Sequence, residues 1–245
     1  MIAMKISIII PTLKESSTIA ATLTHLKKEL RRTDHEVIVS DGGSTDDTVV
    51  LAKQLASRVC EWKEKSRQTI AQGKNIGAKA AQGDFLVFLD ADTVIPHADN
   101  FFFHALEYFA RDEKLVGLTC RIRVLPQYET FADRIFFSFL TSWYIFFNNY
   151  LHIGNSSGEF QMIRRAAFER IGGFREDLVA GEDNDLFIRL ARIGNTRVAT
   201  PLTIFHSGRR AHKMGWPKLL SHWVLNGISV FLFRKSPFKE WKVIR

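Results

Sequence analysis

Residues 84–92 have the sequence DFLVFLDAD, in which five consecutive apolar residues stand between acidic ones. A run that is apolar at every position is typical of a strand that helices cover on both faces of a sheet. Two similar runs precede it, KISIII at residues 5–10 and EVIVS at residues 36–40. The alternation of strands and helices predicts a Rossmann-like α/β fold, with a mostly parallel sheet and helices on both faces. The helices between these strands are expected over 16–32, from Asp46 onward and over 66–81.

The second half of the chain has a different pattern, with longer helices and less regular strands. Its expected strands are 114–125, 159–163, 197–200 and 203–205, and its expected helices are 97–111, 130–151, one that begins near Asp183, and 216–233. No linker interrupts the pattern. We therefore expect one catalytic domain over residues 1–210, followed over residues 211–245 by a C-terminal extension of an apolar, amphipathic helix and a basic tail.

The composition excludes several classes of protein. The chain has 245 residues, of which 46% are hydrophobic and 24% charged, which is ordinary for a globular domain and unlike a disordered chain. Two cysteines, Cys60 and Cys120, are too few for a disulfide framework or a four-thiolate zinc site, and free thiols in a reducing compartment are expected. The first apolar run is too short for a secretory signal, and no clean 20-residue apolar span predicts a transmembrane helix. A cytoplasmic location follows as the expectation.

The net charge of +8 is confined to one end of the chain. Residues 204–245 contain nine Lys or Arg and one acid, Glu240, whereas residues 1–203 contain 25 basic and 25 acidic side chains. A local excess of positive charge indicates phosphates, nucleic acid or an anionic membrane as the partner.

Polar clusters follow the three N-terminal strands. Residues 11–15 (PTLKE), 41–44 (DGGS) and 90–92 (DAD) each come directly after a strand. Open α/β sheets bind ligands at the carboxyl ends of their strands, so the three clusters predict one ligand site. The sequence contains neither G-x-G-x-x-G after the first strand nor G-x-x-x-x-G-K-[ST], which excludes dinucleotide and Walker-type sites.

Asp90-Ala91-Asp92 is the candidate metal motif. Two carboxylates on a loop after a buried strand can hold a hard divalent cation, and the cation can hold a diphosphate. The alternative is a turn in which the aspartates bond only to local backbone. The second D-x-D, Asp183-Asn184-Asp185, falls inside an expected helix, where residues i and i+2 do not face each other, and so is not a metal clamp.

Glu182 and Asp183 stand at the start of an expected helix. Asp183 is a candidate general base at the rim of a cleft, where the helix dipole favours its ionised form. The alternative is a helix N-cap. Further along, His206 ends an apolar run and precedes Arg209 and Arg210. This local chemistry suits an additional metal ligand followed by two arginines that contact phosphates, and the alternative is a structural or exposed histidine.

With these residues in view, the chain resembles the family 2 glycosyltransferases, which have the GT-A fold. The matching stretches are SIIIPTLKES, EVIVSDGGSTDDT, GKNIGAKAAQGDFLVFLDADT and RRAAFERIGGFREDLVAGEDNDLFIRL, which occur in the family's order between residues 6 and 190. The resemblance implies transfer of a sugar from a nucleoside diphosphate donor with inversion at the anomeric carbon, assisted by Mn²⁺ or Mg²⁺.

The resemblance also implies roles for individual residues. Asp183 would be the catalytic base, with Glu182 beside it. Asp92 would bind the metal, together with Asp90 and with His206 as a further ligand. The residues that would contact the nucleotide part of the donor are Pro11, Thr12, Glu15, Asp41, Lys74, Asp90 and Ala91.

The sequence departs from the family pattern at a few positions. Lys14 stands where the family usually has Asn, and Lys74 stands where it often has Arg. The sequence also lacks a clear Gln-x-x-Arg-Trp motif and a bundle of transmembrane helices, so a processive polysaccharide synthase is not expected.

Residues 131–150 contain nine aromatic side chains and are open to three interpretations. They form either a buried core helix, an apolar wall for a lipid acceptor or a membrane-facing surface. An apolar helix over 216–233 followed by basic residues is typical of proteins that bind an anionic membrane, and the alternative is a docked helix with a solvated tail.

The leading interpretation is a metal-dependent, inverting glycosyltransferase. It would use a nucleoside diphosphate sugar as donor and a glycan or lipid-linked acceptor, bind no nucleic acid, and lie peripherally on the inner face of the cell membrane. One alternative is a catalytically idle nucleotide-sugar-binding or scaffold protein. The other is a sugar-nucleotide pyrophosphorylase, which would need a Gly-rich, Arg-containing loop after the first strand where this chain has PTLKES.

Overall fold

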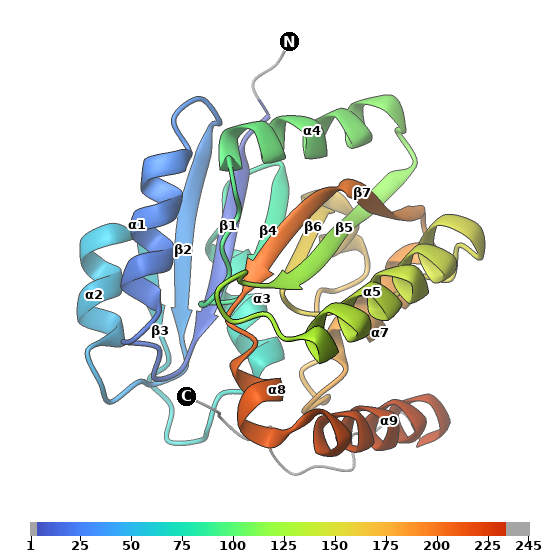
Figure 1. The fold of residues 1–245 in the computed structure, drawn as a ribbon. Coiled ribbons are helices and arrows are strands. Elements are labelled where there is room, and N and C mark those ends of the chain that lie inside the picture. The colour runs from blue at the N-terminus through green and yellow to red at the C-terminus, as the bar shows by residue number, and fades with distance from the viewer. Residues whose placement is uncertain (1–3, 234–245) are drawn as a thin grey trace.

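A computed structural model describes residues 4–233 of the chain (Figure 1). Within them, seven strands form one sheet in the order β3-β2-β1-β4-β6-β5-β7. β1, β2, β3 and β4 pair in parallel, β6 is antiparallel to both β4 and β5, and β5 and β7 pair in parallel. The strands are β1 (Ile6–Thr12), β2 (His35–Asp41), β3 (Arg58–Glu61), β4 (Phe85–Leu89), β5 (Leu115–Val124), β6 (Phe160–Arg164) and β7 (Asn195–His206).

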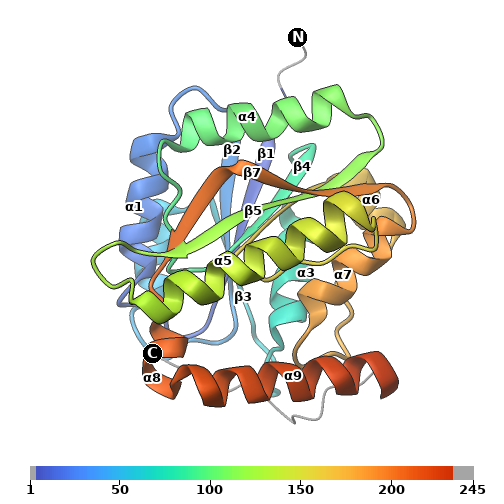
Figure 2. The same ribbon diagram turned by 45° about the vertical axis from the view of Figure 1, so that its right-hand side comes forward.

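Helices pack against both faces of this sheet (Figures 1 and 2). Helices α1, α2, α4 and α5 contribute to the hydrophobic core on one face, and α3, α6 and α7 contribute to the core on the other. The helices are α1 (Ile19–Glu29), α2 (Thr48–Leu55), α3 (Ile70–Ala80), α4 (Ala98–Arg111), α5 (Phe131–Ile145) with its π-helical continuation η1 (Phe146–Tyr150), α6 (Arg165–Arg170), α7 (Glu182–Ala191), α8 (Arg209–Met214) and α9 (Trp216–Phe233).

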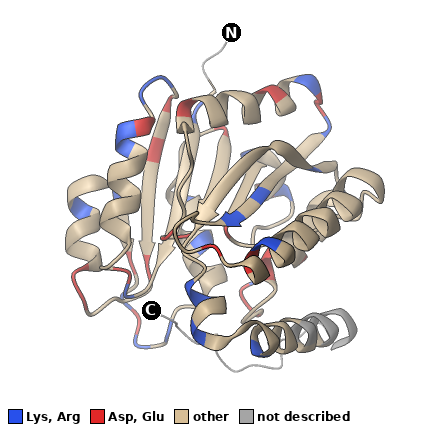
Figure 3. Ribbon diagram, in the orientation of Figure 1, with Lys and Arg blue, Asp and Glu red and all other residues tan. Residues whose placement is uncertain are grey.

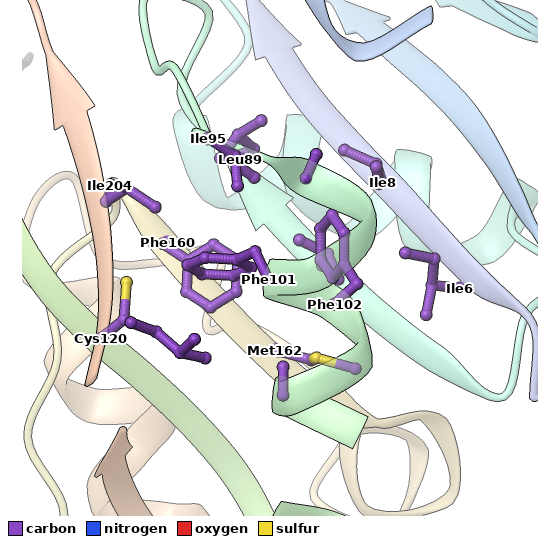
Figure 4. Close-up of a cluster of buried hydrophobic side chains, with 14 of the residues drawn as sticks. Ile6, Ile8, Leu89, Ile95, Phe101, Phe102, Cys120, Phe160, Met162 and Ile204 are labelled. Atoms are coloured by element: carbon purple, nitrogen blue, oxygen red, sulfur yellow. The ribbon is translucent and has the colours of Figure 1, made fainter. Parts of the chain in front are cut away.

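The apolar runs behave as strands with two covered faces. In β1, Ile6 and Ile8 belong to one core cluster while Ile9, whose side chain points the opposite way, belongs to the other. Figure 4 shows the first cluster, in which Phe101 and Phe102 of α4 pack on the sheet beside Phe160 of β6. The centroids of the Phe101 and Phe160 rings are 5.2 Å apart. The expectation of a mostly parallel α/β sheet is therefore confirmed.

The structure differs from the expected elements in four places. β3, α6 and α8 were not expected, because each is only four to six residues long. The two strands expected at 197–200 and 203–205 are one strand, β7, in which Thr200, Pro201 and Leu202 form an irregularity in the register with β5. α8 begins at Arg209, so the boundary expected after residue 210 falls inside a helix, and the division into domain and extension stays a prediction.

α8 and the first two turns of α9 contact the first turns of α5 through their side chains. The ring centroids of Trp216 and Phe136 are 4.1 Å apart, and the indole nitrogen of Trp216 donates to Asp133 at 2.9 Å. His212 of α8 bonds to the same buried carboxylate at 2.8 Å. No helix within residues 4–233 is both long and apolar enough to cross a membrane. The basic residues expected to form a tail after α9 lie outside the described residues.

Candidate active site

A cavity of about 600 Å³ opens where the strands of the parallel half of the sheet end. The carboxyl ends of β1 and β4 meet there with α3, the beginning of α7 and the loop before β6, as expected from the positions of the polar clusters. Helices α5 and α9 add apolar side chains to its wall. Ten of the residues expected at the site line this cavity: Pro11, Thr12, Glu15, Lys74, Asp90, Ala91, Glu182, Asp183, Arg209 and Arg210.

Lys74 is a buried cation in the wall of the cavity. Its helix α3 begins with a capping box between Thr69 and Gln72, and its side chain is only 1% exposed. Its Nζ lies 2.5 Å from Asp183 Oδ1 and 3.6 Å from Glu182 Oε1. Burial alone would lower the pKa of Lys74, but the charges of Asp183 and Glu182 outweigh burial and raise it. Lys74 therefore stays charged and holds the two acids in place.

Glu182 and Asp183 form the first turn of α7. Gly181 precedes them with φ of 85°, a backbone conformation that favours glycine, and no side-chain N-cap bond is present at Gly181. Glu182 is buried, and burial together with the charge of Asp183 raises its pKa to about 7, with Lys74 acting in the opposite direction. Asp183 is more exposed and faces the cavity. Of the two acids, Asp183 is thus the one that a substrate can reach.

Asp90 lies among other acids at the end of β4. Burial raises its pKa to about 8, and the charge of Glu159 contributes the most after burial, while Lys74 lowers it. The sheet register explains this neighbour, because Leu89 of β4 pairs with Phe160 of β6 in antiparallel fashion, so Asp90 and Glu159 continue the same pairing. Glu159 was not expected at the site, since its place depends on the antiparallel pairing of a strand some 70 residues away.

Arg209 connects two other acids. Its guanidinium donates to both carboxylate oxygens of Glu15 at 2.8 Å, and its Nε lies 3.3 Å from Asp92. The hydroxyl of Ser207 also donates to Asp92. Burial would lower the pKa of Arg209, but the Glu15 bond and the Asp92 charge raise it. The arginine expected to contact phosphates is therefore held in the cavity wall, close to the end of β1, by Glu15.

Asp41 does not line the cavity, although Gly42 next to it does. Its carboxylate accepts hydrogen bonds from Thr12 at 3.0 Å and from the backbone nitrogens of Gly43 and Ser44 at 3.0 and 2.7 Å. In this structure Asp41 fixes the loop after β2 and joins it to the end of β1. A contact between Asp41 and a nucleotide stays a prediction.

His206 and Asp92 also lie outside the cavity lining. His206 ends β7 beside Val124, its ring is 4.9 Å from that of Phe137, and its buried Nε2 has no hydrogen-bond partner within residues 4–233. Over the same residues, no three His, Cys, Asp or Glu side chains are grouped closely enough to hold a metal ion. The donor types still suit a divalent cation, because an unpartnered imidazole nitrogen and crowded carboxylates such as Asp90 would both gain from one.

Several lining residues were not expected from the sequence. They supply polar groups near Asp183, positive charge near the β1 end, and apolar surface on α5 and α9. They include Arg67, Gln68, Leu140, Tyr144, Ser157, Gly158, Glu159, Asn184 and Trp223. Only the aromatic pattern of 131–150 signalled any of them, through the interpretation of that helix as a wall of the site.

A model of glycosyl transferase family 2 matches residues 7–172, which is more than half of the chain. The chain belongs to glycosyl transferase family 2. The resemblance expected from the sequence is thus confirmed. The match covers β1 to α6 and ends before α7, so Asp183 and His206 lie beyond it.

The chain is also similar to curated and solved glycosyltransferases and related synthases. The chain is 26% identical to a beta-monoglucosyldiacylglycerol synthase of Nostoc over 98% of this chain and 54% of that protein. A mannosyltransferase from Pyrobaculum calidifontis, solved with GDP-Man and Mn²⁺, matches 95% of this chain and 65% of that one at 21% identity and a TM-score of 0.72. Glucosyl-3-phosphoglycerate synthase from Mycobacterium tuberculosis, solved with Mn²⁺ and UDP, matches 94% and 80% at 21% identity and a TM-score of 0.64.

These likenesses confirm the GT-A type of fold for this family 2 chain. The chain spans only a little over half the length of these curated relatives, with 54% of the Nostoc protein covered and 58% of a succinoglycan biosynthesis protein of Rhizobium meliloti.

Proposed function

We propose that the chain transfers a sugar from a nucleoside diphosphate sugar to an acceptor hydroxyl, with inversion at the anomeric carbon and with Asp183 as the general base. The observation that carries the proposal is the placement of Asp183 in the cavity, held by Lys74, across from the ends of β1 and β4. Pro11, Thr12 and Ala91 from those strand ends would surround the nucleotide.

The geometry suits a direct displacement. Oδ1 of Asp183 is occupied by Lys74, which leaves Oδ2 to accept the proton of the attacking hydroxyl. Gly158 has no side chain that would block Oδ2, whereas a Cβ at this position would lie 2.6 Å from that oxygen. A base on the acceptor side of the sugar and a leaving diphosphate on the other need no covalent intermediate, which supports inversion.

Positive side chains would stabilise the departing diphosphate. Arg209 and Arg210 line the cavity at the end of β7, and each arginine can bond to two phosphate oxygens at once. For Arg209 to do so it would share or exchange its bonds to Glu15 and Asp92. The phosphate role of both arginines is part of the proposal.

Asp92 would hold a divalent metal, with Asp90 and His206 as further ligands. When bound, Mn²⁺ or Mg²⁺ would neutralise charge that develops on the leaving diphosphate. Mn²⁺ is present in the Pyrobaculum and Mycobacterium structures, which supports the same choice here. Asp92 would have to relinquish or share its contacts with Arg209 and Ser207 to bind the ion.

The acceptor would be lipid-linked, and the protein would lie peripherally on the anionic, cytoplasmic face of the membrane. Leu140 of α5 and Trp223 of α9 form an apolar part of the cavity wall, suited to a lipid tail. The outer face of α5 and η1 is apolar and exposed, and Figure 3 shows no charge on α5 beyond its first turns. Its exposed large apolar side chains are Phe131, Ile135, Phe139, Trp143, Phe146 and Tyr150, named here the α5 ridge. The Nostoc relative is named as a synthase of a glucosyldiacylglycerol, which supports a lipid acceptor.

Thermal unfolding in the presence of UDP-glucose, UDP-GlcNAc and GDP-mannose, each with Mn²⁺ or Mg²⁺, tests the donor. A donor at about 100 times its Kd should add about 2.7 kcal/mol to the free energy of unfolding. Hydrolysis of the stabilising donor without acceptor then separates an enzyme from a scaffold. Stabilisation by a donor without hydrolysis or transfer would favour the idle nucleotide-sugar-binding protein.

A further inference from the structure

Among the described residues that line the cavity, four have a buried side-chain polar atom without a partner, and two of these atoms only accept hydrogen bonds. These two are Oε2 of Glu159, in the loop before β6, and Oδ1 of Asn184, in the first turn of α7. Within residues 4–233 neither atom accepts a hydrogen bond, and no cation forms an ion pair with Glu159. Buried polar atoms in folded proteins are rarely left in this state, and those that line a cavity are expected to bond to what the cavity binds.

The position of these atoms relative to the base is defined by the fold. Asn184 directly follows Asp183 on α7, and Gly158, next to Glu159, packs against Asp183 Oδ2 and Lys74. On its other side, Glu159 is opposite Asp90 through the pairing of β4 with β6. Glu159 also acts on Tyr144 of α5, since burial and then the negative charge of Glu159 raise the pKa of that phenol. Glu159 thus lies between the end of β4 and the base.

The sugar of the donor has to lie in the same part of the cavity, between the end of β4 and Asp183. In the proposed reaction its diphosphate lies at the end of β4 and its anomeric carbon lies within reach of an acceptor bound by Asp183. The sugar ring therefore spans the distance from Asp90 to Asp183, beside Glu159 and Asn184 in the cavity wall.

The chemistry of the two atoms is also selective. A carboxylate oxygen and an amide oxygen only accept hydrogen bonds, so the ligand must bring donors. Neighbouring hydroxyl groups of a sugar ring supply such donors, whereas phosphate oxygens do not. Lys74 is paired with Asp183 and Arg209 with Glu15, so Glu159 is not needed to neutralise either of these two cations.

We propose that Glu159 and Asn184 form the subsite that binds the hydroxyl groups of the transferred sugar and so select which sugar is transferred. This inference rests on the proposed function, because it takes the cavity to be a nucleotide-sugar site. Glu159 and Asn184 act in binding and specificity, while Asp183 remains the base.

The test compares a nucleotide with its sugar conjugate. The Kd of the full-length chain is measured by calorimetry in saturating Mn²⁺ for UDP against UDP-glucose and for GDP against GDP-mannose, and the pair with the tighter wild-type binding is used. Glu159→Gln removes the charge at nearly constant shape, and Asn184→Leu removes the amide without changing the net charge. In each variant the Kd of the sugar nucleotide should rise about tenfold or more, the loss expected for a hydrogen bond in a buried site, while the Kd of UDP or GDP changes less than twofold.

Thr196→Val is the matched control. Its hydroxyl oxygen is also buried without a partner, but Thr196 lies in β7 away from the cavity, so this variant should bind both ligands like the wild type. Equal losses for the nucleotide and its sugar conjugate in Glu159→Gln and Asn184→Leu would overturn the inference, as would unchanged binding of both. An unchanged donor Kd with a raised KM for the acceptor would also overturn it, by assigning the two residues to the acceptor. If the wild-type chain binds neither nucleotides nor sugar nucleotides, the proposed function itself fails.

Discussion

Lys74 Nζ and Asp183 Oδ1 lie 2.5 Å apart, although the two residues are separated by 109 positions in the sequence. Lys74 comes from the middle of α3 and Asp183 from the first turn of α7, and both belong to the wall of one cavity. The contact fixes one oxygen of the proposed base and leaves the other without a bond to Lys74. Because a buried lysine holds it, the orientation of the proposed base is set by the fold.

Replacing Asp183 by Asn should reduce turnover at least about 10²-fold, because an amide cannot take the proton of the acceptor hydroxyl. Donor affinity and the melting temperature should stay close to those of the wild type, since the amide oxygen can still accept from Lys74. Steady-state kinetics of donor hydrolysis, in which water takes the place of the acceptor hydroxyl, measures the effect. Near-normal turnover would leave Asp183 with a purely structural role.

Replacing Lys74 by Met should destabilise the fold by about 3–5 kcal/mol, because it leaves two buried acids without their cation. Urea unfolding of the two proteins measures the difference. Lys74→Arg is the matched control, and it should keep most of the stability because it preserves the charge. A Lys74→Met protein as stable as the wild type would show that Glu182 and Asp183 do not need this cation.

Stability should fall as the pH rises from about 5 to 8. In the folded chain the pKa of Glu182 is raised to about 7 and that of Asp90 to about 8, from ordinary values of 4.5 and 3.8, mainly by burial. At any pH between the ordinary and the raised pKa of an acid, that acid is protonated in the folded state and has lost its proton in the unfolded state. Raising the pH therefore favours unfolding, by about 1.4 kcal/mol per pH unit for each excess proton.

Urea unfolding at intervals of half a pH unit, in EDTA, measures this dependence. Glu182→Gln cannot titrate and should flatten the part of the profile between about pH 5 and 7. A wild-type profile that is level or rises from pH 5 to 8 would contradict the assignment of raised pKa values to these two acids.

Much of the fold was predictable because β1, β2 and β4 are covered on both faces. The positions in the middle of these strands, 8–10, 37–39 and 86–88, are all apolar, and this pattern is visible without knowledge of the partners. β3 was missed because it is a four-residue edge strand, with Arg58 and Glu61 exposed at its ends. The sequence predicted two strands in place of β7 because a proline such as Pro201 usually interrupts a strand. In the structure the strand continues, and Pro201 lies where the register with β5 shifts.

The site was predictable where it follows a strand and less so where tertiary packing creates it. Glu15, Asp90 and Ala91 were expected from the rule that ligands bind at the carboxyl ends of parallel strands. The pairing of Arg209 with Glu15 joins residues 194 positions apart, and no local pattern encodes it. Glu159 reaches the site only because β6 runs antiparallel to β4, a reversal that the apolar pattern of residues 159–163 does not reveal.

Asp92→Ala and His206→Ala should each weaken the binding of UDP or GDP in the presence of Mn²⁺, and Asp92→Ala should have the larger effect because a carboxylate is the stronger ligand for this ion. Calorimetric titration with and without EDTA measures the change. His25→Ala serves as a control, since His25 bonds to the carbonyl of Ile95 and neither residue lines the cavity. If EDTA leaves both nucleotide binding and transfer unchanged, the metal role of Asp90, Asp92 and His206 is wrong.

Binding to a membrane should depend on two surfaces that can be altered separately. The α5 ridge exposes large side chains, among them Phe131 at 77% and Phe139 at 63%, and aromatic side chains of this kind insert at the level of lipid headgroups. The second surface is the run of basic residues after α9, known from the sequence alone. Each Lys or Arg near an anionic leaflet contributes about 1 kcal/mol, which salt reduces.

We expect the full-length protein to co-sediment with vesicles of anionic phospholipid, and to do so less at high salt. The double variant Phe139→Ser/Trp143→Ser removes apolar insertion from exposed positions and should weaken sedimentation at every salt concentration. A chain that ends at residue 233 loses five basic residues and should weaken it mainly at low salt, while one that ends near Met214 also loses α9 and should lose most binding. These truncations should reduce transfer to a lipid-linked acceptor more than donor hydrolysis, because the cavity residues on β1, β4 and α7 remain. Full-length protein that ignores anionic vesicles at low salt would refute membrane binding and favour a soluble acceptor.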